Sequence, residues 1–121
     1  MDIITGNLNE KRQLEHGNWV VGHFIAEGSP FRTENFEVKW INRKKGVIKK
    51  GALAKRQAST LVILIQGKMM IRFPGSKNKA LLKEQGDFVY YDANQTLHES
   101  ETLEDTVAIV LRWPSFPDSF T

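Results

Sequence analysis

The stretch "STLVILIQGKMMIRFPG", residues 59–75, constrains the fold of this chain more than any other segment. It holds two runs of aliphatic and β-branched residues that meet at Gln66-Gly67, and each run has the composition and the period of two typical of a half-buried strand. A glycine between two such runs predicts a tight hairpin with Gln66 and Gly67 as its turn residues. One face of the hairpin would then carry Thr60, Val62, Leu64, Met69, Ile71 and Phe73.

Shorter segments on both sides of this pair also have strand character. They are "NWVVGHFIA" (18–26), "NFEVKWIN" (35–42), "DFVYY" (87–91) and "DTVAIVLRW" (105–113). In 35–42, one face carries Phe36, Val38 and Trp40, and the other carries Glu37, Lys39 and Ile41. Short strands at near-regular spacing predict an all-β sandwich or barrel.

The N-terminal segment predicts a short helix over residues 7–17. Asn7 is a suitable N-cap, Glu10 stands three residues on as in a capping box, and Gly17 can end the helix in the left-handed conformation. We therefore expect one domain over 1–121, with a helical segment at 1–17, a barrel at 18–113 and a tail at 114–121.

The composition excludes several kinds of chemistry. With no cysteine, the chain has no disulfide, no thiolate nucleophile and no sulfur-ligated zinc or iron–sulfur site. The start lacks the basic and apolar regions of a signal peptide, and the aliphatic run "LVILI" is too short to cross a bilayer. We expect a cytoplasmic protein with no membrane partner.

The net charge of +3 is modest, but the charges are segregated. Residues 43–59 hold seven of the 17 Lys and Arg and no acid, whereas residues 92–105 hold five of the 14 acids and no base. If the fold brings the two segments together, they form a polarised mouth that attracts an anionic group. The alternatives are two ordinary solvated loops, or a nucleic-acid contact through the basic stretch 43–56.

The order of these signals resembles that of a small single-domain cupin, a jelly-roll (RmlC-like) barrel with two motifs. The first family motif is G-x5-H-x-H-x(3 or 4)-E-x6-G, and its last glycine matches Gly67. Its glutamate position then falls on Thr60, and its two histidine positions fall on Ala54 and Arg56. The resemblance thus implies the cupin fold without the metal ligands of this motif, so we expect no metal cofactor.

The second family motif is G-x5-P-x-G-x2-H-x3-N, and Gly86-Asp87 before an apolar strand matches its opening. Asp92 takes the proline position and Asn94 the second glycine position. His98 lies 12 residues after Gly86, one more than the pattern has. If the turn absorbs the extra residue, His98 points into the barrel, and otherwise it points outward.

The resemblance implies a cavity in the barrel, and we expect it to bind a small, anionic ligand. Arg56 would offer its five N–H donors to a carboxylate or phosphate, although a rim arginine paired with Glu99 or Glu101 is the alternative. His98 would be a second polar contact. The expected walls of the cavity are Trp40, Thr60 and Tyr91.

Other functions stay open at this point. His98 is the single candidate for a catalytic base, as in metal-free sugar epimerases and isomerases of the cupin class, so whether the chain is an enzyme is undecided. A metal-dependent cupin enzyme would have to recruit His16 or His23 from outside the motifs. The resemblance also implies a homodimer, for which the strand at 18–26 can supply an edge.

Overall fold

The structure is a computed structural model that describes residues 3–10, 16–51, 58–92, 98–115 and 117. Its regular elements are all strands, which confirms the predicted all-β class. No helix lies in the described ranges. The strands are β1 (Trp19–Val21), β2 (Glu37–Arg43), β3 (Ile48–Lys50), β4 (Ser59–Arg72), β5 (Lys79–Leu82), β6 (Phe88–Tyr91) and β7 (Glu99–Trp113).

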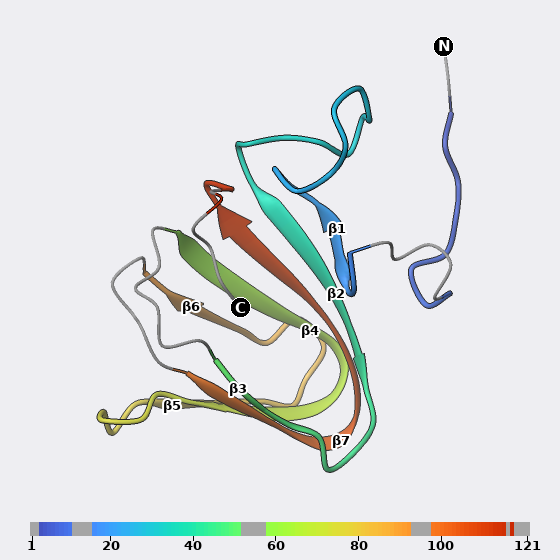
Figure 1. Ribbon diagram of the computed structural model, residues 1–121. Helices are drawn as coiled ribbons and strands as arrows, with labels where there is room; N and C mark the ends of the chain where they lie inside the picture. Colours follow the sequence, from blue (N-terminus) through green and yellow to red (C-terminus); the bar gives the residue numbers. More distant parts are fainter. Residues whose placement is uncertain (1–2, 11–15, 52–57, 93–97, 116, 118–121) are drawn as a thin grey trace.

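The two long strands β4 and β7 form the spine of the barrel. They pair antiparallel along most of their length and bend together, so that each contributes to two facing layers (Figure 1). One layer has the order β6-β4-β7-β2-β1, and the other has the order β5-β4-β7-β3. This is the double-layered jelly roll that the family resemblance implied, and it is one of the all-β forms expected from the strand pattern.

The predicted hairpin at Gln66-Gly67 is wrong, because β4 continues through these residues as one strand. The register with β7 shifts between Leu64 and Met69, and Gly67 has a φ of 100°. A Cβ at Gly67 would collide with the carbonyl oxygen of Asp105. A bulge and a hairpin both shift by one residue the alternation of inward and outward side chains along the chain. The sequence pattern around Gly67 therefore fits either structure. The predicted grouping on one face is nevertheless confirmed, since the six residues all point into the barrel and are buried: Thr60, Val62, Leu64, Met69, Ile71 and Phe73.

The predicted N-terminal helix is not seen. The Asn7 side chain accepts a hydrogen bond from the N–H of Asn9 at 2.8 Å, which makes a local turn in place of a helix cap. Gly17 does adopt a left-handed φ of 63°, but it does so in the turn between His16 and Trp19. So short a helix is marginal in water without tertiary packing, and capping residues alone do not secure it. Residues 11–15 lie outside the described residues.

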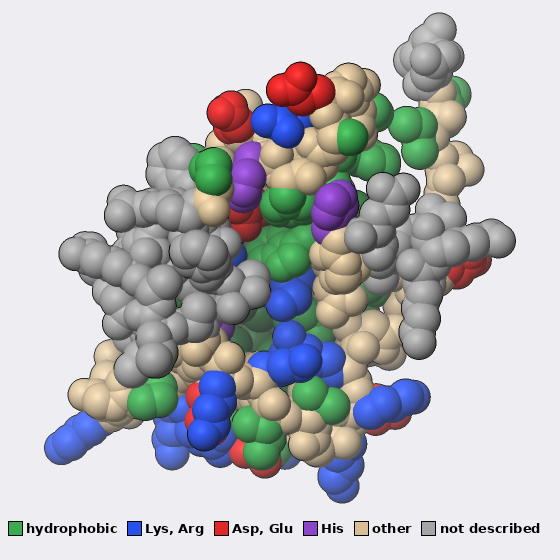
Figure 2. All heavy atoms as spheres, in the orientation of Figure 1, with side chains coloured by type: hydrophobic (Ala, Val, Ile, Leu, Met, Phe, Trp, Pro, Cys, Tyr) green, Lys and Arg blue, Asp and Glu red, His purple; other side chains and the backbone are tan. Residues whose placement is uncertain are grey.

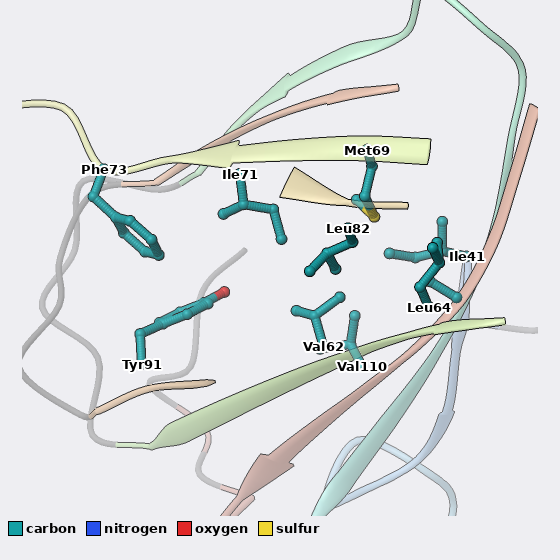
Figure 3. Close-up of a cluster of buried hydrophobic side chains, with 10 residues drawn as sticks. Ile41, Val62, Leu64, Met69, Ile71, Phe73, Leu82, Tyr91 and Val110 are labelled. Atoms are coloured by element: carbon teal, nitrogen blue, oxygen red, sulfur yellow. The ribbon is translucent and has the colours of Figure 1, made fainter. Parts of the chain in front are cut away.

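The core lies between the two layers and is closed at one end by aromatic rings. In Figure 3, the side chains of Met69 and Ile71 in the far half of β4, and of Phe73 just after it, point toward those of Val62 and Tyr91. The rings of Phe73 and Tyr91 meet edge to face, with 5.3 Å between centroids. The barrel is therefore filled at this end, and the space that remains lies toward β2, β3 and the start of β7.

Candidate ligand-binding site

A small cavity remains inside the barrel next to this core. It has a narrow inner part of about 50 Å³ and a wider outer part of about 250 Å³. Figure 2 shows this face hollowed at its centre, with hydrophobic side chains in the depth and Lys and Arg side chains on its lower wall. The residues that line both parts are Lys39, Arg43, His98, Ser100 and Arg112.

The alternation along β2 brings two of these cations to the cavity. Lys39 pairs with Val110 of β7, and Arg43 pairs with Thr106, and both partners lie on the buried side of β7. Ile41, between the two cations, is 3% exposed and belongs to the core. The inner face of β2 thus carries basic side chains on both sides of an apolar contact.

Arg43 is the cation whose surroundings point most directly to a ligand. Its Nη1 donates to the Ser100 hydroxyl at 3.1 Å, and burial lowers the pKa of its guanidinium from the ordinary value. No Asp or Glu lies among the described residues that line the cavity, and none in the described chain forms an ion pair with Arg43. Because a desolvated cation is costly without a counter-charge, this site favours an anion.

Arg112, in contrast, has its counter-charge within the protein. Its Nη1 lies 3.5 Å from Oε2 of Glu37, and both side chains are almost fully buried. The guanidinium stacks over the Trp19 ring at 4.7 Å, and the Lys39 ammonium lies 5.4 Å from the same ring. Arg112 therefore forms a neutralised wall of the cavity and adds little net charge.

The Glu37 carboxylate also organises a polar cluster at the end of the barrel. The Ser115 hydroxyl donates to Oε1 of Glu37 at 3.0 Å and lies 2.6 Å from Nδ1 of His23. His23 is thereby placed beside Glu37, whereas His98 is on the cavity wall. In the described part of the chain, no three His, Asp or Glu side chains gather in the manner of a metal site.

His98 faces the cavity, so the extra residue after Gly86 does not turn it outward. Its ring lies 5.4 Å from that of Tyr91, and its carbonyl oxygen accepts the Gly51 N–H at 2.7 Å. A Cβ at Gly51 would lie 2.6 Å from Nδ1 of His98, so the absence of a side chain there makes room for the ring. Gly51 and Tyr91 together fix where the imidazole sits.

The predicted site residues have different outcomes. Tyr91 and His98 line the cavity, and Thr60 is fully buried beside it, between Tyr91 and Arg112 in the sheet register. Trp40 lies on the outer face of β2, where its Nε1 donates to Asn9 Oδ1 at 2.8 Å. Arg56 lies outside the described residues. The lining residues that sequence reasoning missed are Lys39, Arg43, Ser100 and Arg112, although the alternation had put Lys39 on one face with Ile41.

A separate groove of about 320 Å³ runs beside the N-terminal segment. Its lining includes His16, Trp19 and Phe31, and the described residues around it contain no Lys or Arg. His16 is thus placed at this groove, and the groove has no charged group that would select an anion.

The sequence matches no family model and no curated protein. Solved structures with a similar fold do exist. KdgF from Halomonas sp. is 20% identical, over 71% of this chain and 76% of that chain, with a TM-score of 0.56. An RmlC-like cupin from Shewanella frigidimarina is 16% identical, over 71% of this chain and 72% of that chain, also with a TM-score of 0.56.

The fold is the cupin jelly roll. A third similar structure, the DMSP lyase DddQ from Ruegeria pomeroyi, is 16% identical over 78% of this chain, which spans 45% of that chain, with a TM-score of 0.58. At these identities the likeness concerns the cupin fold alone, because one fold carries many functions. Separately, no described helix is long and apolar enough to cross a membrane.

Proposed function

We propose that this cupin-fold protein binds a small anionic ligand in its barrel, with Arg43 as the principal contact. The observation that carries the proposal is a partly buried guanidinium whose described partner is a neutral hydroxyl, in a cavity without described carboxylates. A carboxylate or phosphate of the ligand would accept from the guanidinium fork and from Ser100. Lys39 would add attraction from the same face of β2.

Other cavity residues complete the proposed site. His98 supplies a polar contact in the cavity that also holds the cations, Tyr91 supplies an aromatic wall, and Thr60 supplies a buried hydroxyl that has no described hydrogen-bond partner. Arg56 stays a proposed contact from the sequence motif. Trp40 is left out, since its ring lies on the outer face of the sheet.

The location of the basic stretch favours a small ligand over nucleic acid. Arg43, Lys49 and Lys50 of this stretch all line the outer part of the cavity. A concave space of about 250 Å³ suits a small molecule, whereas phosphates of a polynucleotide need an extended, charged surface.

A thermal-shift screen tests the proposal with inorganic phosphate and with small mono-, di- and tricarboxylates at constant ionic strength. A bound anion at about 100 times its Kd should add about 2.7 kcal/mol to the free energy of unfolding. Arg43→Gln should abolish the shift. The matched control is Lys44→Gln, which removes a neighbouring cation that is 85% exposed. Absence of any shift in the wild type, or an equal shift in Arg43→Gln, would overturn the proposal.

A second candidate function is metal-free isomerisation or epimerisation with His98 as general base. The observation that favours it is the imidazole facing the cavity that also holds Arg43, where an anionic substrate would be held. Transfer of deuterium from solvent into a hydroxy- or keto-acid ligand found in the screen measures this activity. The exchange should disappear in His98→Gln, whereas anion binding should weaken but stay measurable because Arg43 is retained, and a ligand that never exchanges would leave binding as the sole function.

A further inference from the structure

The cationic side chains that line the cavity form two groups, which are separated along β2. Lys39 and Arg43 both lie on the inner face of this strand, and their Cα atoms are about 14 Å apart at about 3.4 Å per residue. Ile41 lies between them and is 3% exposed. A ligand that reaches both cations must therefore cross an apolar contact.

The first group, called the Arg43 group, consists of Arg43 and Lys49. The Arg43 guanidinium donates to the Ser100 hydroxyl, and Lys49 of β3 pairs with the same Ser100 in the sheet register. Residues that pair directly across two strands point to the same face, so Lys49 lies on the cavity side of β3. The next residue, Lys50, pairs with Glu99 and so has an acidic neighbour in the register.

The second group, called the Lys39 group, consists of Lys39 and Arg112. The Lys39 ammonium and the Arg112 guanidinium lie over the same Trp19 ring, at 5.4 Å and 4.7 Å from its centroid. The Glu37 carboxylate lies 3.5 Å from Arg112. Two cations and this one carboxylate sum to one net positive charge, so the second group also attracts an anion.

The wall that the two groups share is apolar. The inner part of the cavity, of about 50 Å³, is lined by Lys39 and Arg43 and by aliphatic or thioether side chains from three strands. These side chains are Ile41, Val62, Met69, Ile71 and Val110. Carbon atoms of a ligand gain free energy from contact with such a wall, whereas charged atoms lose hydration there.

We propose that the ligand is a dianion with its two acidic groups at the ends of a short hydrocarbon chain, an α,ω-dicarboxylate. This inference rests on the proposed anion binding at Arg43 and adds a second anchor at Lys39. One carboxylate would accept from Arg43 and Ser100, with Lys49 beside it, and the other would lie at Lys39. The chain between them would lie over Ile41.

The separation of the two groups sets which diacids fit. Oxalate and malonate hold their two carboxylates too close together to reach both groups at once, and inorganic phosphate is a single head group. Glutarate and adipate have longer and flexible chains. We therefore expect the two longer diacids to bind through both groups, and the compact anions to bind through the Arg43 group alone.

Isothermal titration calorimetry of the wild type tests the second anchor without any variant. The ligands are malonate, glutarate, adipate and the monomethyl esters of glutarate and adipate, at neutral pH and constant ionic strength. Glutarate or adipate should bind about tenfold more tightly than its own ester, since a hydrogen bond to a charged group contributes at least this factor. Malonate should bind about as weakly as the esters.

Variants assign the two anchors to their residues. Lys39→Gln should weaken binding of the longer diacids about tenfold and leave binding of the esters unchanged. Arg43→Gln should weaken both. The matched control is Lys44→Gln, at a lysine that is 85% exposed and does not line the cavity, and it should change neither.

Tryptophan fluorescence gives a second readout on the Lys39 group. The chain has three tryptophans, so Trp40→Phe and Trp113→Phe together leave Trp19 as the single emitter. Movement of the Lys39 ammonium from the ring toward a bound carboxylate should change the Trp19 emission. Adipate should cause this change, and its monomethyl ester should not.

The outcomes separate this inference from the proposed anion binding. Equal affinity for the longer diacids and their esters, an equal loss of both in Lys39→Gln, or the same Trp19 response to both would overturn the two-anchor ligand and leave anion binding at Arg43 in place. Failure of the wild type to bind any of these acids or inorganic phosphate would overturn both proposals.

Discussion

Arg43 of β2 donates from Nη1 to the hydroxyl of Ser100 on β7, over 3.1 Å. The bond joins two strands that come from distant parts of the chain, and it holds the guanidinium on the wall of the cavity. A neutral hydroxyl does not balance the charge. In the ligand-free protein Arg43 is therefore a position where binding and stability have opposite requirements.

Arg43→Met should remove anion binding without reducing the stability of the ligand-free protein. We expect the free energy of unfolding to stay the same or to rise by about 1 kcal/mol, because a partly buried cation without a carboxylate is replaced by a shorter, unbranched apolar side chain. Urea denaturation of the wild type, Arg43→Met and the exposed-site control Lys44→Met measures the effect. A larger loss in Arg43→Met than in the control would show that Arg43 stabilises the fold.

Gly51→Ala should displace the His98 ring. The added Cβ would lie 2.6 Å from Nδ1 and 2.9 Å from the carbonyl oxygen of His98, and Gly51 is not among the glycines with positive φ, so the effect comes from these contacts and not from a left-handed backbone. The imidazole signals of His98 in NMR spectra should shift strongly. In a His98→Ala background, Gly51→Ala should cost less stability than in the wild type, because the ring is gone. Equal costs in both backgrounds would contradict this role for Gly51.

Glu37→Ala should be strongly destabilising. It leaves the Arg112 guanidinium, which is 4% exposed, without the carboxylate that lies 3.5 Å away. Breaking a buried pair from one side costs about 3–5 kcal/mol. The comparison is Asp105→Ala at the exposed Lys44–Asp105 pair, which should change stability far less. Similar losses for the two variants, measured by urea denaturation, would argue against the importance of the buried pair.

Asp87→Asn should alter the acid limb of the stability profile. The backbone N–H groups of Lys83 and Glu84 donate to the carboxylate and lower the pKa of Asp87 below its ordinary value of 3.8. The folded state therefore favours the ionised form, and this stabilisation is present above pH 3.8 and lost as pH falls through the lowered pKa. The stability difference between wild type and Asp87→Asn should shrink in that range. A difference that stays constant with pH would contradict the assignment.

The sequence predicted the faces of the long strands better than their connections. Thr60, Val62 and Leu64 share a face because side chains alternate along any strand, whatever follows it. The prediction that the chain reverses at Gly67 was wrong. Only the pairing with β7 shows that the shift in side-chain alternation there is a bulge within one strand. The short strands β3 and β5 escaped prediction because their sequences, "IKK" and "KALL", become strands by pairing with β7 and β4.

The site was predicted in part for a related reason. His98 came from the motif spacing and Tyr91 was expected as an aromatic wall, and both line the cavity. Trp40 was assigned to the cavity as an apolar residue, but on β2 the apolar face is the outer one and the basic face is the inner one. The hydrophobicity pattern does not tell which face of a strand points into the barrel. That Lys39 and Arg43 line the cavity is therefore evident only from the structure.

The shared spine of the two layers also governs how the barrel can form. β4 (Ser59–Arg72) and β7 (Glu99–Trp113) are separated by the whole of β5 and β6, and neither layer exists without both. Neither layer can therefore fold independently before the other, because each needs both long strands. The chain must close long loops before its central ladder forms, which places it among slow-folding topologies, on timescales of about milliseconds to seconds. Truncation from either end of β4 or β7 should accordingly abolish the whole domain and leave no half-barrel intermediate.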